Sequence, residues 1–328
     1  MIRNGEQPQS RPASSSRWDE LDELDVRIIE ALNVNGRASM SSLSSHLNRP
    51  VGRIKSRYDR LVSRGLLHTV ALLDPGALGR PVVAHLTVRT RRGNFALADR
   101  LAAVAGVAWI GVGADFETLL VQVSTPNNDA LVELINSHVW GDDDTVMVSS
   151  AIVLRSWSPT FAVEPRQIEP RDLTRILWRT GRDLAKPLDD VDRELLRCLE
   201  RDARMTLTEM SKHAGLSVPA TRQRLRHLMD DGVVRFRTGP DSRSGAVQVV
   251  RLQLQIEGGS SGVVASLAAM PNVNFISEST GDFPVSAEFL CADELQIRDA
   301  HEGAFAIPGV VAARMVRFDR ILLHTGHW

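Results

Sequence analysis

The sequence contains two copies of one long pattern, and this internal repeat limits the possible folds more than any other feature. The segment LDELDVRIIEALNVNGRASMSSLSSHL begins at Leu21, and the similar segment LDDVDRELLRCLERDARMTLTEMSKHA begins at Leu188. Subtracting 21 from 188 gives an offset of 167 residues. The same offset pairs, without a gap, Asp25 with Asp192, Arg37 with Arg204, His46 with His213, Arg57 with Arg224, Gly65 with Gly232, and Asp115-Phe116 with Asp282-Phe283. The chain is therefore a duplication of one unit.

Each copy begins with three predicted helices. The first helix of copy one is indicated by apolar residues at helical spacing, namely Leu24, Ile28, Ile29 and Leu32. Two further helices are expected over Ser39–Leu47 and Val51–Arg64. Asn48 and, in copy two, Gly215 occupy the turn before the third helix, where a residue that tolerates positive φ is needed. This order predicts a helix-turn-helix in each copy.

The rest of each copy predicts a βαββαβ order. Copy one has expected strands at Val82–Arg89, Val107–Gly113, Glu117–Val123 and Val146–Arg155, with helices near Phe95–Ala105 and Asn128–Ser137. Copy two has expected strands at Val247–Ile256, Val273–Thr280, Val285–Cys291 and Val310–Leu323, with helices near Val263–Met270 and Glu294–Phe305. The expected fold class is α+β: two winged-helix-like helix-turn-helix domains and two ferredoxin-like βαββαβ sandwich domains of RAM type.

These elements give predicted domain boundaries. They are a disordered tail (1–17), a first helix-turn-helix domain (18–72), a first ferredoxin-like domain (73–157), a linker (158–187), a second helix-turn-helix domain (188–240) and a second ferredoxin-like domain (241–328). Cys198 and Cys291 are expected to be buried free thiols of a reducing compartment, the cytoplasm. The sequence has no run of about 18 apolar residues, so we expect no segment that spans a membrane and no membrane partner.

The third helix of each copy carries polar and cationic side chains outside its apolar face. At 100° per residue, the core side holds Val51, Ile54, Tyr58, Leu61 and Val62 in copy one, and Val218, Thr221, Leu225, Leu228 and Met229 in copy two. Arginine and glutamine suit base edges and phosphates. The candidate DNA contacts are Arg53, Lys55, Ser56, Arg57, Arg60, Arg64, Arg222, Gln223, Arg224, Arg226 and His227.

A single helix of this kind is as often an ordinary solvent-exposed helix as a DNA-binding helix. Two of them, each after a matching short helix and turn, favour double-stranded DNA as the partner. The net charge of −1, from 39 basic and 40 acidic residues, excludes only a uniformly basic surface. Because the sequence has no C-x₂-C, H-E-x-x-H, phosphate-binding loop or dinucleotide motif, we expect no metal, no cofactor and no catalytic residue.

The stretches quoted above, together with AGVAWIGVGADFETLLVQV and PNVNFISESTGDFPVSAEFLC, resemble the Lrp/AsnC (feast/famine) transcriptional regulators. The resemblance implies a tandem-duplicated form that binds an amino acid or related effector between paired sensing domains and assembles as a homo-oligomer through them. The implied effector-binding residues are Gly113, Ala114, Asp115, Thr280, Gly281 and Asp282. Copy one departs from the family's Thr-Gly-Asp turn, and these glycines equally suit simple hairpin turns.

The same arrangement also resembles the sirohaem decarboxylases of tetrapyrrole biosynthesis, which gives an enzyme as the alternative function. That family has an Arg-Arg-Phe-Gly segment after the helix-turn-helix and a histidine near it. Copy two has Val234-Arg235-Phe236-Arg237 and copy one has Leu67-His68-Thr69, so both depart from the pattern. The arginines retained on the third helix favour a regulator without enzymatic activity.

Overall fold

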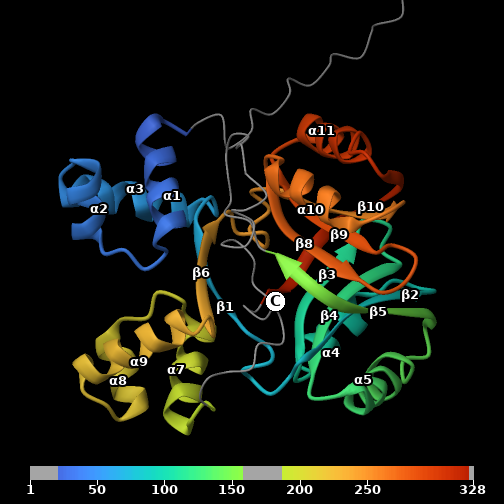
Figure 1. Cartoon of the computed structure of the whole chain (residues 1–328), viewed down its shortest axis with the longest axis horizontal. Coiled ribbons are helices and arrows are strands. Elements are labelled where there is room, and N and C mark those ends of the chain that lie inside the picture. Colours follow the sequence, from blue (N-terminus) through green and yellow to red (C-terminus); the bar gives the residue numbers. More distant parts are fainter. Residues whose placement is uncertain (1–20, 158–186, 325–328) are drawn as a thin grey trace, which may run out of the picture.

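The computed structural model describes residues 21–157 and 187–324 of the 328-residue chain. Two three-helix units lie on one side of the molecule, and a larger body of strands and helices lies on the other (Figure 1). This duplicated α+β architecture is the fold class that the sequence predicts. The predicted tail at 1–17 and all of the predicted linker except residue 187 fall outside the described residues.

The three-helix units, called head one and head two below, follow the two repeats. Head one consists of α1 (Glu23–Val34), α2 (Met40–Leu47) and α3 (Val51–Ser63). Head two consists of α7 (Asp190–Arg201), α8 (Leu207–Ala214) and α9 (Val218–Asp230). Most helices begin at a side chain that accepts a hydrogen bond from a free backbone N–H, which stabilises the first turn; these residues are Asp22, Ser39, Asp189, Thr206 and Ser217.

The tight turns of both helix-turn-helix units adopt the left-handed conformation that the sequence predicts. Asn48 has φ 50° and Gly215 has φ 65°. The expected core face of the third helices was wrong at its edges. Val51, Val62 and Met229 are 44%, 42% and 43% exposed. A helical wheel assigns faces but not the width of the contact, and here only the centre of each face is buried.

The body contains two ferredoxin-like units, and their helices cover opposite sides of it (Figure 1). The first unit has β2 (Val82–Thr90), α4 (Phe95–Ala102), β3 (Val107–Gly113), β4 (Thr118–Thr125), α5 (Asn128–Leu134), a π-helical turn (Ile135–Val139) and β5 (Thr145–Trp157). The second has β7 (Gln248–Ile256), α10 (Ser260–Ala269), β8 (Val273–Ser279), β9 (Val285–Cys291), α11 (Glu294–Phe305) and β10 (Val310–His324). Their strand orders, β3-β4-β2-β5 and β8-β9-β7-β10, are equivalent.

The two sheets join into one closed barrel because β5 and β10 are longer than the other strands. The first part of β5 pairs with β2 and its last residues pair with β8 of the other unit. In the same way, β10 pairs first with β7 and then with β3. Closure leaves no unpaired edge strand in the barrel. The repeated units therefore form an internal pair within one chain.

The heads also exchange structure through two short strands. β1 (His68–Leu73) follows head one, β6 (Val234–Gly239) follows head two, and they pair antiparallel with each other. Ala71 and Leu73 of β1 pack into the core of head two. Ala246, which follows β6, packs into the core of head one. Each head is thus completed by residues of the other copy, which a division into separate sequence segments does not show.

Candidate functional site

The outer surface of α3 is formed by three candidate DNA contacts. Arg53, Lys55 and Ser56 are exposed near the start of the helix, on the side away from the buried Ile54 and Leu61. Lys55 forms an exposed i,i+4 ion pair with Asp59 at 2.6 Å, a kind of pair that contributes little to stability. These side chains are free to reach a ligand outside the protein. We call Arg53, Lys55 and Ser56 the outer face of α3.

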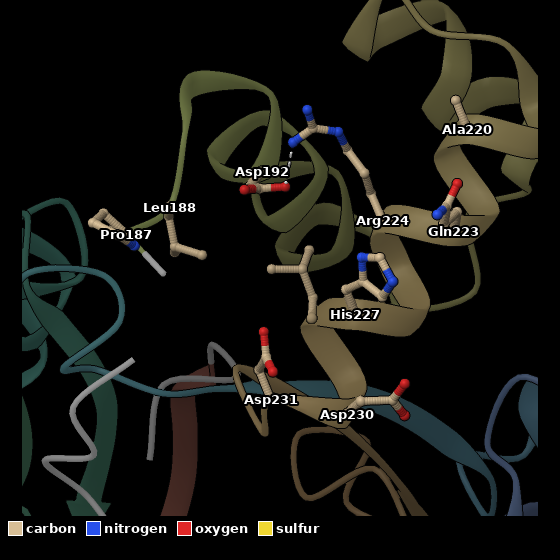
Figure 2. Close-up of a pocket in the computed structure, with 10 residues that line it drawn as sticks. Pro187, Leu188, Asp192, Ala220, Gln223, Arg224, His227, Asp230 and Asp231 are labelled. Carbon is tan, nitrogen blue, oxygen red and sulfur yellow. Dashed lines mark hydrogen bonds and ion pairs between the residues drawn. The ribbon is translucent and has the colours of Figure 1, made fainter. Parts of the chain in front are cut away.

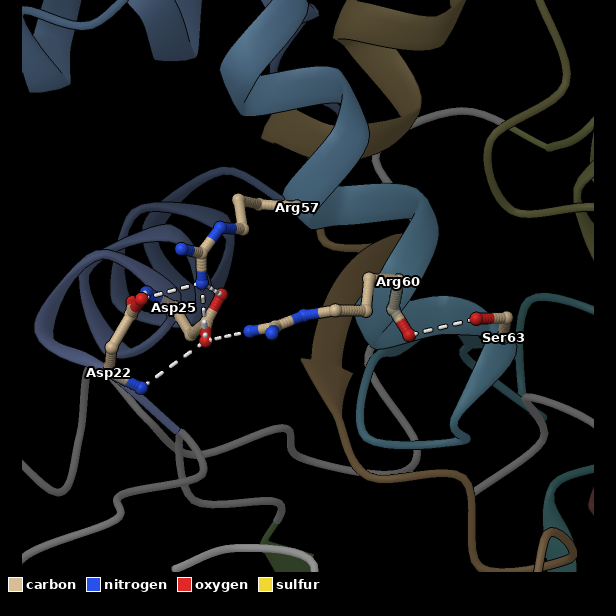
Figure 3. Close-up of polar contacts among 5 residues, drawn as sticks. All are labelled: Asp22, Asp25, Arg57, Arg60 and Ser63. Carbon is tan, nitrogen blue, oxygen red and sulfur yellow. Dashed lines mark hydrogen bonds and ion pairs between the residues drawn. The ribbon is translucent and has the colours of Figure 1, made fainter. Parts of the chain in front are cut away.

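Arg57 and Arg60 of the same helix point instead toward α1 (Figure 3). Both guanidinium groups contact the carboxylate of Asp25, which is fully buried, and Arg57 also contacts Asp22. Asp22 and Asp25 form the capping box at the start of α1. Arg57 and Arg60 therefore neutralise a buried charge and hold α3 against α1. Arg64, at the end of α3, is half-buried.

Head two repeats this arrangement with one arginine. Arg224 of α9 donates to Asp189 at 2.6 Å and to Asp192 at 2.8 Å (Figure 2 shows the contact with Asp192). The backbone N–H of Asp192 and the Arg224 guanidinium hold the pKa of Asp189 below its ordinary value. Residue 60 of head one corresponds to His227, which makes no such contact. In this structure Arg57, Arg60 and Arg224 therefore anchor the third helices to the first helices.

The outer face of α9 comprises Arg222, Gln223, Arg226 and His227, all exposed. Gln223 and His227 lie beside a groove of about 380 Å³ between α9 and the start of α7 (Figure 2). Asp192, Asp230 and Asp231 also line this groove, which makes it a poor site for an anion. Arg224 also lines the groove and is paired with Asp192 there, whereas Arg222 and Arg226 do not line it.

The two heads are fastened to each other by a reciprocal pair of arginines, Arg37 and Arg204. The guanidinium of Arg37 donates to the backbone carbonyl groups of Ala203 and Met205. The guanidinium of Arg204 donates to the carbonyl groups of Gly36 and Ala38. Because the two arginines occupy equivalent repeat positions, each head holds the loop between the first two helices of the other.

Aromatic rings complete this contact. Arg37 lies over the ring of Phe236 at 5.4 Å, and Arg204 lies over the ring of Tyr58 at 5.1 Å, distances at which a cation is attracted to the π face. We call Arg37 and Arg204 with their carbonyl and ring partners the head clamp. Sequence reasoning noted these arginines only as part of the repeat. Their retention at equivalent positions was the available signal.

The turn at Thr280, Gly281 and Asp282 lies in a pocket of about 320 Å³ between the two halves of the barrel. Thr280 is fixed to β5 of the other unit, since its backbone N–H donates to the Ile152 carbonyl and its hydroxyl accepts from the Ile152 N–H, both at 2.9 Å. The pocket is lined by residues of both copies, among them His85, Ser149, Ser150, Arg251, Asp282 and Arg314.

The equivalent turn in copy one differs in what its carboxylate does. Asp115 accepts hydrogen bonds from the backbone N–H groups of Glu117 and Thr118 and from the Thr118 hydroxyl. The cavity beside Gly113, Ala114 and Asp115 is smaller, about 260 Å³. Both turns are hairpin turns, as the simpler sequence interpretation expects, but only the copy-two turn borders the larger pocket.

A buried polar network forms the floor of the larger pocket. The guanidinium of Arg251 donates to the buried Glu288 carboxylate at 3.0 Å and stacks 4.3 Å from the centroid of the Trp109 ring. His85 makes a 3.1 Å hydrogen bond with Gln122. Desolvation, together with the nearby Arg251 charge, lowers the pKa of His85 to about 3. His85 is therefore neutral at physiological pH. None of these floor residues was identified from the sequence.

One further cluster of side chains could not be found from the sequence spacings that are typical of metal sites. The ligand atoms of Glu194, Cys198 and His213 lie within 4.8 Å of one another. The Glu194 carboxylate already contacts Arg197 at 2.6 Å and Arg201 at 3.7 Å. These arginines supply the positive charge that a cation would bring, so we assign the cluster no metal-binding role. Among the described residues, no helix is long and apolar enough to cross a membrane.

Comparison with known proteins supports the function suggested by the heads. A family model described as winged helix-turn-helix DNA-binding matches residues 21–67 and 188–235. An uncharacterized HTH-type transcriptional regulator of Pyrococcus horikoshii is 30% identical over 122 residues, which span 37% of this chain and 77% of that protein. The HTH-type transcriptional regulator LrpA of Mycobacterium tuberculosis is 52% identical over 48 residues, 15% of this chain and 32% of that protein.

A solved structure shares the duplicated architecture. The siroheme decarboxylase NirDL is 14% identical, with a TM-score of 0.60, over 92% of this chain and 93% of that chain. At this identity the likeness shows the fold alone. The relatives that carry the sequence similarity are HTH-type transcriptional regulators. The chain belongs to the HTH-type transcriptional regulators of the Lrp/AsnC family and is a DNA-binding transcriptional regulator.

Proposed function

We propose that both heads of this tandem-duplicated regulator contact duplex DNA, through the outer faces of α3 and α9. The observation that carries this proposal is the division of labour among the arginines. Arg57, Arg60 and Arg224 anchor the third helices, whereas Arg53, Arg222 and Arg226 are exposed to solvent. Exposed arginines on the second helix of a helix-turn-helix suit phosphate oxygens and guanine edges.

Affinity measurements on the full chain test this proposal. Arg53→Gln together with Arg222→Gln is expected to weaken binding to a genomic duplex at least tenfold, because two charge-assisted contacts are lost. Arg298→Gln on α11, a helix outside the barrel and away from the heads (Figure 1), removes one exposed charge as the control. Equal affinities for the three proteins, measured by fluorescence anisotropy, would contradict the proposal.

The second part of the proposed function is regulation by a small effector in the pocket at Thr280–Asp282. Asp282 and Arg314 line the pocket and have no partner among the residues that the structure describes. A free carboxylate and a free guanidinium, with the hydroxyls of Ser149 and Ser150 between the barrel halves, suit a small zwitterion such as an amino acid. Binding at this seam would shift the balance between arrangements of the two copies.

A thermal-shift screen with the twenty common amino acids tests the effector proposal. Stabilisation of the wild-type protein by one amino acid should be lost in Asp282→Asn and in Arg314→Gln. Asp115→Asn, at the equivalent turn of copy one, is the matched control and should keep the response. If Asp115→Asn abolishes stabilisation while the other two variants retain it, the pocket is wrongly assigned. Self-association through the barrel and a cytoplasmic location are part of the same proposal.

The fold shared with NirDL makes a tetrapyrrole enzyme the second candidate. Against it stands the segment Val234-Arg235-Phe236-Arg237, which has valine in place of the first arginine of that family's pattern and does not line the barrel pocket. The pocket itself, about 320 Å³, is at the lower end of the range for small-molecule sites. Spectral titration with an iron tetrapyrrole distinguishes the two: an unchanged spectrum supports the regulator, and conversion of the tetrapyrrole would establish the enzyme.

A further inference from the structure

The two third helices differ at four positions that are exposed on α3. With the offset of 167 residues, Arg53 of α3 corresponds to Ala220 of α9, and Ser56 corresponds to Gln223. Lys55 and Asp59 likewise correspond to Arg222 and Arg226. The anchoring position is the same in both heads, since Arg57 and Arg224 both bind the cap of the first helix. The two copies therefore share the anchoring arginine but differ in the exposed residues of the third helix.

These positions belong to the part of a recognition helix that contacts bases. In helix-turn-helix proteins the N-terminal residues of the second helix approach base edges in the major groove. Arginine pairs with guanine and glutamine with adenine, and an alanine methyl contacts the thymine methyl group. Arg53 on one helix, and Ala220 with Gln223 on the other, therefore favour different bases. The two heads cannot prefer the same half-site sequence.

The heads are also fixed relative to each other within one chain. The head clamp joins the loops after α1 and α7, and the β1–β6 ladder runs over six residue pairs. The hydroxyls of Thr69 and Thr238 meet at 3.0 Å in the middle of this ladder, and both residues are buried. A pair of heads held in this way offers one separation and one relative orientation to a duplex.

A homodimer of one-headed subunits presents the same helix twice, and its symmetry demands a palindromic site. This chain escapes that demand because its two heads are covalently joined and unlike. We propose that a single chain binds one duplex segment with two different half-sites, in a fixed order and at a fixed spacing. The inference rests on the proposed function, namely that both α3 and α9 contact DNA.

Selection of bound duplexes from a random library, followed by native mass spectrometry of the selected complex, tests the inference. We expect a bipartite motif whose halves are not inverted copies of each other, with equal numbers of chains and duplexes in the complex. A palindromic motif, or two chains on the duplex with one head of each engaged, would overturn it. Failure to retain any duplex would instead refute the proposed function, so the two failures are distinguishable.

Changes in half-site spacing test whether the heads are rigidly joined. Inserting about 5 base pairs, half a helical turn, should weaken binding roughly 100-fold, because only one head can then engage. Inserting about 10 base pairs restores the helical face but not the distance, so binding should stay weak. Recovery of full affinity at the longer spacing would show that the heads move independently and would overturn the fixed arrangement.

A change of specificity gives the sharpest outcome. Replacing Arg53→Ala, Lys55→Arg and Ser56→Gln gives α3 the side chains of α9 at these positions. This variant should now select a motif whose two halves are inverted copies, with affinity for the wild-type site lowered about tenfold or more. Changing Arg298→Gln on α11 should leave the selected motif unaltered. If the substituted protein selects the wild-type motif unchanged, the outer faces do not determine which half-sites are read.

Discussion

Removing the head clamp should uncouple the two heads at a measurable cost in stability. Arg37→Ala deletes two hydrogen bonds from a charged donor to backbone carbonyl groups and a contact with the Phe236 ring. Hydrogen bonds to charged groups contribute roughly 1.5–3 kcal/mol each, and Arg37 is half-buried, so we take the lower value. The expected loss is then about 3 kcal/mol in the free energy of unfolding of the heads.

Arg204→Ala should cost a similar amount, because Gly36 and Ala38 are buried and their carbonyl groups lose their donor. A loss of about 3 kcal/mol corresponds to a fall in Tm of roughly 12–24 °C for a unit of 60–100 residues, the size class of the two heads together. The double variant should lose less than the sum of the single losses. Once one arginine is gone, the heads already separate more easily, so the two sites are coupled.

Differential scanning calorimetry of the full chain measures these losses, and hydrogen exchange of the β1–β6 amides reports head separation directly. Arg27→Ala, at an exposed position on α1, is the control and should change stability by less than about 0.5 kcal/mol. If Arg37→Ala and Arg204→Ala behave like Arg27→Ala, and the β1–β6 amides stay protected, the clamp does not join the heads.

Four further outcomes follow from single positions. Ser217→Ala should cost about 1 kcal/mol by urea denaturation, because the Ser217 hydroxyl caps the first turn of α9; no change would refute the cap. Gly215→Ala should cost roughly 1–2 kcal/mol since φ is 65° there, with nothing near enough to clash, whereas Asn48→Gly should be neutral or stabilising. His85 has a pKa of about 3 in the folded chain and about 6.5 unfolded, so the unfolded chain binds its proton first as the pH falls. Its contribution is present above pH 6.5 and is lost toward pH 3, and at pH 5.5 His85→Gln should be relatively more stable by at most about 1.4 kcal/mol. Identical pH dependence in both proteins would contradict the low pKa.

The sequence was sufficient for the elements of each copy because their signals are local. The strands Val107–Gly113 and Val285–Cys291 have the bounds that the βαββαβ order predicted. The left-handed turns at Asn48 and Gly215 were predictable for the same reason. Each depends on residues within one or two turns of chain. Periodicity and turn preferences act on that scale.

What the sequence did not show depends on contacts between elements that are separated along the chain. Nothing local indicates that the last residues of β5 leave their own sheet for β8. The head clamp joins residues 166 to 168 positions apart. A helical wheel gave Arg57 as a candidate DNA contact, because a wheel represents one helix and does not include the ion pairs of Arg57 with Asp22 and Asp25. Repeat symmetry predicts equivalent parts, but not how the parts pair.

The dependence of DNA affinity on salt is the most direct test that both heads contact the duplex. For a double-stranded site, affinity decreases with salt, and the plot of log affinity against log salt has a negative slope. The magnitude of this slope decreases by about 0.9 for each phosphate contact that is lost. We predict a less negative slope when Arg53 and Lys55 of head one are changed to glutamine. Changing Arg222 and Arg226 of head two should have a comparable effect, and the two effects should add. A slope that responds to one head only, or to neither, would contradict the two-headed account.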